Sequence, residues 1–95
     1  MKLLNSEGKQ IEKVDFGVVE AGKQKTVLVT LFNDDISTLT EIEIKTNHQE
    51  VELSNVPTTV DSREKKEFKL TWKPSVNIKK GLIADIIIKC SELWS

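Results

Sequence analysis

The sequence predicts an all-β domain of seven antiparallel strands packed as a two-sheet sandwich, with no substantial helix. Apolar and polar residues alternate with a period of two through most of the chain, which is typical of strands with one face in a core and one in water. Residues that favour turns recur about every 8–12 residues, the spacing expected of a sandwich or a small barrel. We therefore expect short strands that all turn one face towards a shared core.

The expected strands follow from these two patterns, and several of them are rich in β-branched residues. In chain order they cover residues 14–16, 26–32, 41–45, 50–54, 58–60, 67–72 and 82–90. The turns between them are expected at residues 21–22, 33–35, 47–48, 55–57, 61–62, 74–75 and 79–81. Phe16, Phe68 and Trp72 are expected to supply most of the aromatic bulk of the core.

The length of 95 residues corresponds to one domain, so we expect a single domain over residues 1–95. Within it, residues 1–12 are expected to form an arm or a small hairpin that turns at residues 6–8. Residues 13–90 are expected to form the sandwich, and residues 91–95 a C-terminal tail.

Charge and cysteine content narrow the setting in which such a domain would work. The formal net charge is -1, so the sequence provides no strong field that would favour nucleic acid or an anionic membrane surface. Cys90 is the single cysteine, which excludes an intramolecular disulfide and suits a reducing compartment. The apolar stretch Leu3-Leu4 is too short for a signal peptide. We therefore expect a cytoplasmic protein without a membrane segment.

Three local features, in order, resemble the immunoglobulin-like family that includes the major sperm protein and ASH-type domains. They are Val14-Asp15-Phe16-Gly17-Val18-Val19 with Gly22 and Leu31-Phe32-Asn33, then Val60-Asp61 with Phe68-Lys69-Leu70-Thr71-Trp72-Lys73-Pro74, then Gly81 before the closing strand. The resemblance implies a seven-stranded immunoglobulin-like sandwich that serves as a building block or in protein–protein contact. Members of similar folds also occur as accessory or decoration subunits of bacteriophage virions, so a virion is the second expected location. The Cys…Trp…Cys core of immunoglobulin domains proper is not present.

Few residues offer catalytic or metal-binding chemistry, so we expect no enzyme, no cofactor and no metal. His48 is the single histidine and lies in a polar turn, where an exposed position is expected. Cys90 shares a face with Ile86 and Ile88 and is expected to be a small buried apolar residue. Two further sets of residues match their possible ligands poorly: Asn33, Asp34 and Asp35 with Asp61 or Glu64 as calcium ligands, and the pairs Lys65-Lys66 and Lys79-Lys80 as nucleic-acid contacts.

Apolar side chains on strand faces that are expected to be exposed to solvent are the candidate interaction residues. The period of two turns Leu28 and Phe32 outward in one strand and Ile83 and Ile87 outward in the last. Leu93-Trp94 lies beyond the expected strands. Grouped exposed apolar residues mark interfaces, although twisted strands or a tail that closes the core would explain the same pattern. The candidate interface residues are Leu28, Phe32, Ile83, Ile87, Leu93 and Trp94.

The sequence therefore predicts a non-enzymatic structural or assembly subunit that acts through protein–protein contacts in a homo- or hetero-assembly, with a virion accessory or decoration protein as one setting. One alternative is a cytoplasmic adaptor that binds a peptide or partner protein along a sheet edge. Another is a carbohydrate-binding module, for which only Trp72 and Trp94 could act as stacking platforms.

Overall fold

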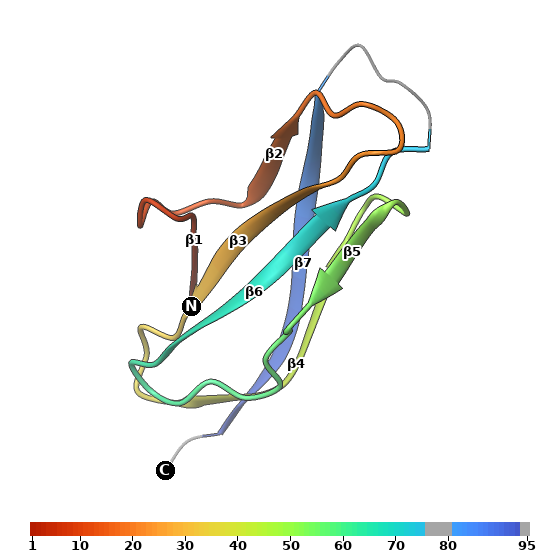
Figure 1. Cartoon of the computed structure of the whole chain (residues 1–95). Coiled ribbons are helices and arrows are strands. Elements are labelled where there is room, and N and C mark those ends of the chain that lie inside the picture. Colours follow the sequence, from red (N-terminus) through yellow and green to blue (C-terminus); the bar gives the residue numbers. More distant parts are fainter. Residues whose placement is uncertain (76–80, 94–95) are drawn as a thin grey trace.

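The computed structural model describes residues 1–75 and 81–93, and it consists of two antiparallel sheets that share one core (Figure 1). The first sheet has the order β1-β3-β6-β5, formed by β1 (Lys2–Leu4), β3 (Lys25–Phe32), β6 (Lys65–Trp72) and β5 (Val51–Ser54). The second has the order β2-β7-β4, formed by β2 (Lys13–Gly17), β7 (Leu82–Leu93) and β4 (Thr38–Thr46). No helix occurs among the described residues. The predictions of an all-β chain and of two sheets are thus confirmed.

The seven strands differ from the predicted seven in three main places. Residues 58–60 do not form a strand; instead Val60 makes an isolated bridge to β4, in which Leu39 and Val60 exchange N–H···O bonds of 2.9 Å. The seventh strand is β1, in the segment expected to be an arm or a small hairpin. It pairs with the end of β3, and Leu4 also makes an antiparallel bridge to Gln10. The closing strand β7 continues to Leu93, so residues 91–93 are paired with β4 and are not part of a tail.

The core lies between the sheets and follows the period-two pattern closely. In β6, Phe68, Leu70 and Trp72 are fully buried, whereas Glu67 and Lys69 between them are exposed and Thr71 is half-buried. Phe16 from β2 contacts Trp72 from the other sheet, with ring centroids 5.9 Å apart. The remaining buried apolar residues are Val14, Val19, Val29, Leu31, Leu39, Ile42, Ile44, Val51, Val60 and Ala84. All three predicted core aromatic residues are therefore confirmed as core.

The start of the chain is divided between the two sheets. After β1, a turn closed by the Asn5 side chain, which accepts N–H bonds from Glu7 and Lys9, reverses the chain. Ile11 then donates its N–H to the Leu3 carbonyl (2.8 Å), and the chain crosses to the second sheet as β2. Because β1 and β2 occupy different sheets, neither extends along the whole length of the domain (Figure 1).

β2 ends in a bulge at which two glycine residues come very close. The register of β2 against β7 shifts between Asp15 and Gly17, and Gly17 has a φ of 65°, in the left-handed region that favours glycine. A Cβ atom added to Gly81 would lie 3.0 Å from the carbonyl carbon of Gly17. The entry to β7 therefore passes so close to the end of β2 that a side chain at position 81 would displace the backbone.

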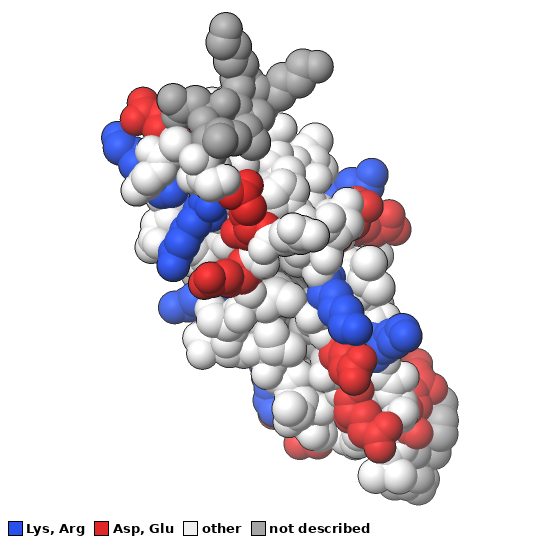
Figure 2. Space-filling view, turned by 90° about the vertical axis from the view of Figure 1, so that its right-hand side faces the viewer, with Lys and Arg blue, Asp and Glu red and all other residues white. Residues whose placement is uncertain are grey.

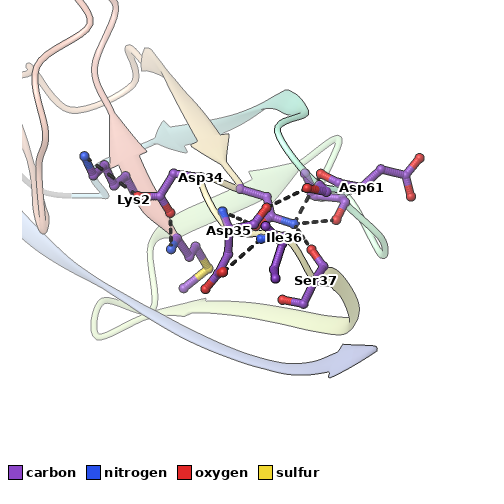
Figure 3. A network of polar contacts seen from close by, with 10 residues as sticks. Lys2, Asp34, Asp35, Ile36, Ser37 and Asp61 are labelled. Atoms are coloured by element: carbon purple, nitrogen blue, oxygen red, sulfur yellow. Dashed lines mark hydrogen bonds and ion pairs between the residues drawn. The ribbon is translucent and has the colours of Figure 1, made fainter. Parts of the chain in front are cut away.

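Asn33, at the end of β3, joins the two sheets through a buried polar network (Figure 3). Its Nδ2 group donates to the carbonyl oxygens of Ser37 (2.7 Å), Val60 (3.1 Å) and Asp61 (3.2 Å), and its Oδ1 accepts the N–H of Asp35 (3.1 Å). Ser37 leads into β4 of the second sheet, and Val60 is itself bonded to β4. One side chain thus fixes the crossing from β3 to β4 and the segment that leads to β6.

We expect Asn33→Ala to lower the free energy of unfolding by about 3 kcal/mol, because buried carbonyl groups would lose their donor. The nearly isosteric Asn33→Asp should be at least as damaging, since a carboxylate would face three carbonyl oxygens. Urea unfolding followed by tryptophan fluorescence measures both. Asn47→Ala, which removes an exposed amide bonded to Asp85, is the control and should cost less than about 1 kcal/mol. Equal losses at the two asparagines would contradict the role of Asn33.

Candidate interaction surface on β7

β7 is the central strand of its sheet, but its neighbours cover it unequally. β2 pairs with residues 82–85, and one further bond runs from the Ile86 N–H to the Glu12 carbonyl (3.3 Å). β4 pairs with residues 86–89 and 91–93 on the other side, with a bulge in β4 opposite Cys90. Beyond Ile86, therefore, no described strand pairs with the edge of β7 on the β2 side. A central strand with half of one edge open is a ready template for pairing with another chain.

A groove of about 230 Å³ opens where β2 leaves β7. The described residues that line it are Met1, Lys2, Leu3, Gln10, Ile11, Glu12, Ile86 and Ile88. The inward side chains of β7 change from buried Ala84 to half-buried Ile86, Ile88 and Cys90 along this groove. The alternation predicted for the closing strand is correct, but burial of its inward face is incomplete because no described strand continues the line of β2.

The outer face of β7 carries three large apolar side chains. Ile83, Ile87 and Leu93 are 58%, 50% and 63% exposed, respectively. Asp85 separates the first two and forms an ion pair with Lys13 (3.7 Å). We call Ile83, Ile87 and Leu93 the β7 row, which is an interrupted line of apolar residues and not a continuous patch.

Leu28 and Phe32 lie on the outer face of the other sheet, so they do not belong to the β7 row. Leu28 is 40% exposed. Phe32 is half-buried, and the ammonium group of Lys65 lies 5.0 Å from the centre of its ring. The structure therefore divides the predicted interface residues between two opposite faces. Trp94 lies outside the described residues.

Charges of both signs are scattered over the face shown in Figure 2, which is the right-hand side of Figure 1. No large area of a single sign is visible there, in agreement with the net charge of -1. Of the two lysine pairs, Lys65 covers Phe32, and Lys66 donates to the Thr59 carbonyl (2.6 Å) and pairs with Glu64 (3.5 Å). Lys79-Lys80 lies outside the described residues.

Three of the carboxyl groups considered as metal ligands, those of Asp34, Asp35 and Glu64, are engaged in other contacts (Figure 3). The amino group of Met1 donates to Asp34 Oδ1 (2.6 Å), and this hydrogen bond lowers the pKa of the Asp34 carboxyl from its ordinary 3.8. Asp35 Oδ1 accepts the N–H of Ile36 (2.8 Å). In the part of the chain that the structure describes, no three His, Cys, Asp or Glu side chains are placed to hold a metal ion. These residues act there as turn and capping groups.

His48 is half-buried, so the expectation of an exposed turn residue is wrong. Its ring packs edge-on against Trp72, with centroids 6.3 Å apart, and its Nδ1 accepts the N–H of Glu50 (3.2 Å). The buried Trp72 indole N–H makes no hydrogen bond of ordinary geometry among the described residues, although it lies close enough to the Glu50 carboxyl to favour its charged form. Cys90 is also half-buried, where a fully buried residue was expected.

Glu50 is the second carboxyl group with a lowered pKa. Its Oε2 accepts the N–H of Ser75 (2.8 Å), and this bond favours the charged form and lowers the pKa from its ordinary 4.5; His48 and the Trp72 indole contribute less. The contact joins the turn before β5 to the end of β6, next to the rings of His48 and Trp72. It stabilises this end of the sandwich and brings no catalytic partner to Glu50.

Comparisons with known proteins found no matching protein family, no similar curated protein and no similar solved structure. In the described part of the chain, no helix qualifies as a membrane span. The function therefore has to be inferred from the exposed groups of the chain itself.

We expect the wild type to have a larger free energy of unfolding than Glu50→Gln. The difference should be greatest above pH 4.5 and should decrease as the pH falls through the lowered pKa of Glu50. The reason is that protonation removes the charge that the Ser75 N–H stabilises. Urea unfolding at a series of pH values from 2 to 7 measures this difference. Glu52→Gln, at an exposed carboxyl group, controls for the loss of one negative charge. A constant difference between wild type and Glu50→Gln would contradict the assignment.

Proposed function

We propose that this protein is a non-enzymatic structural or assembly subunit that acts through protein–protein contacts, with β7 as its principal contact strand. The observation that carries the proposal is the β7 row, in which Ile83, Ile87 and Leu93 are each at least half exposed on one face. Single exposed apolar residues are common on soluble proteins, but three large ones on one strand favour a contact surface. The incompletely covered edge of the same strand adds backbone groups that a partner can bind.

The strand order supports an immunoglobulin-like arrangement as part of this proposal. In the constant-type immunoglobulin domain one sheet contains strands A, B, E and D, and the other contains C, F and G. The sheet β1-β3-β6-β5 corresponds to A-B-E-D in both chain order and neighbours, and β4 and β7 correspond to C and F. β2 then lies beside β7, where strand G lies in that domain. This correspondence agrees with the resemblance to the major sperm protein and ASH-type domains.

A repetitive assembly is the proposed setting, and a virion accessory or decoration subunit is one form of it. The near-neutral charge and the position of the β7 row along one side suit a small domain that adds to a larger surface. In this proposal the protein is located in the cytoplasm or on a virion, and its partners are proteins.

A cytoplasmic adaptor is the second candidate, and the open edge of β7 favours it. An extended peptide could pair with the backbone of this edge while its side chains enter the groove beside Ile86 and Ile88. The carbohydrate-binding alternative gains no such support. Trp72, one of its two candidate platforms, is fully buried in the core and offers no ring face to a sugar.

We expect the protein to sediment with a large assembly in gentle extracts of the cells that naturally produce it. The triple variant Ile83→Ser/Ile87→Ser/Leu93→Ser should move at least about tenfold more of the chain to the monomer fraction, because it removes the exposed apolar groups. Leu28→Ser on the opposite face is the matched control and should sediment like the wild type. Circular dichroism checks that both variants fold.

A wild-type chain found only in the 10.8 kDa fraction would contradict the assembly proposal. Saturable binding of one soluble partner, lost in the triple variant, would favour the adaptor. If Leu28→Ser released the chain from the assembly and the triple variant did not, the contact surface would be on the other sheet.

A further inference from the structure

The open edge of β7 presents backbone groups from alternate residues only. The Asp85 N–H points to the β4 side, where it bonds Asn47 Oδ1 (2.9 Å), and the Ile86 N–H points to the β2 side, where it bonds Glu12. Backbone groups of successive residues in a strand point to opposite edges. The N–H and C=O groups of Ile88, Cys90 and Glu92 therefore lie on the open edge, on the same side as those of Ile86.

These three residues define how another strand can add to the edge. Pairing at or before Ile86 is blocked, because Glu12 and β2 already occupy that part of the edge. On the other side of β7, residues 86–89 and 91–93 pair with β4, and a bulge in β4 between Thr40 and Glu43 lies opposite Cys90. β7 itself continues as a strand past this bulge to Leu93. An added strand can thus use Ile88, Cys90 and Glu92 without disturbing any backbone pairing of the described residues.

The same edge of a second copy matches this requirement in one antiparallel register. A two-fold axis at Cys90 pairs Ile88 with Glu92 of the second copy, Cys90 with Cys90, and Glu92 with Ile88, so every open group has a partner. An axis at Lys89 would place two lysines face to face and would need the Ile86 N–H, which is already bonded to Glu12. An axis at Ser91 would leave Ile88 unpaired among the described residues.

The register centred on Cys90 also matches the exposed side chains. It places Ile87 of each copy opposite Leu93 of the other, so that two exposed members of the β7 row cover each other twice. Lys89 lies opposite Ser91, so no like charges face each other on this side. On the inner side, Ile88 and Cys90, which are half-buried in the single chain, become shielded by the second copy.

We propose that the open edge of β7 binds the same edge of a second copy about a two-fold axis at Cys90, forming a continuous β4-β7-β7-β4 sheet. This inference rests on the proposed function, because it names a second copy of the chain as one partner of the subunit. The contact is closed by its symmetry, so it produces a dimer and not an open fibre.

Cysteine cross-linking tests the axis directly. In a hydrogen-bonded antiparallel pair the two Cα atoms are about 5.5 Å apart, which lies in the range that a disulfide spans. Mild oxidation of the purified chain should therefore yield a covalent dimer through Cys90, detected by mass spectrometry, and Cys90→Ala should abolish it. The register is tested by mixing Ile87→Cys/Cys90→Ala with Leu93→Cys/Cys90→Ala. The mixture should give the mixed disulfide at least about tenfold faster than either variant gives its own dimer.

Charge exchange tests the same register without covalent chemistry. Ile87→Glu and Leu93→Lys should each weaken the dimer about tenfold in analytical ultracentrifugation, because each replaces two apolar cross-strand pairs. The double variant Ile87→Glu/Leu93→Lys should recover most of this loss, since opposite charges then face each other twice. Within the chain, position 87 faces Lys45 and position 93 faces Thr38, so both changes are compatible with the fold. Leu28→Glu on the opposite face is the control and should leave the dimer unchanged.

A chain that remains monomeric at millimolar concentration, with no fast Cys90 disulfide, overturns the dimer. So does a dimer that the charge-exchange pair does not rescue. Hydrogen exchange separates this inference from the proposed function. Concentration-dependent protection of the amides of Ile88, Cys90 and Glu92 supports the dimer, whereas protection only by a different protein overturns it and leaves the proposed contact function intact. A dimer in a chain that joins no larger assembly would support the inference and count against the assembly proposal.

Discussion

The buried amide of Asn33 is the constraint on which the arrangement of the two sheets depends. It lies where β3 leaves the first sheet, and its donors reach the carbonyl groups of two segments that belong to or touch β4 in the second. A buried amide is tolerated only when its polar atoms are bonded, so this network fits one relative position of the loops. The position of β4 then determines where the C-terminal part of β7, from Ile86 on, can pair.

The surface of β7 is a consequence of that arrangement and of the divided first strand. Because β1 remains in the first sheet, the short β2 is the one described strand on this edge of β7, and it covers the first four residues of a twelve-residue strand. Beyond Ile86, the backbone groups on this edge have no described strand partner. The inward side chains of this part of β7 are half-buried, and its outward apolar side chains are exposed. Pairing in trans would satisfy all three at once, since a sheet edge is extended by backbone bonds and stabilised by cross-strand side-chain pairs. A contact of this kind needs no pocket and no catalytic group.

The candidate site shows which parts of a surface a single sequence can indicate. The alternation of apolar and polar residues correctly predicted that Leu28, Ile83 and Ile87 point outward, because side-chain direction in a strand is a local property. It could not show that Leu28 lies on the opposite face from the other two, since this depends on which strand joins which sheet. The open edge was missed altogether. The one available signal was a mismatch in length between the long apolar alternation at residues 82–90 and the short strands expected elsewhere.

The sequence by itself determined the all-β class, most of the strands and the core aromatic residues, because period-two patterning and turn residues act locally. It also determined that β7 has an inward and an outward face. Only the tertiary structure decided that β1 pairs with β3 and that Val60 makes a bridge and no strand, since both depend on contacts between distant segments. The same is true of His48, which packs on Trp72 although its local sequence is polar. The half-open edge of β7 was likewise decided by where neighbouring strands begin and end, which no local pattern records.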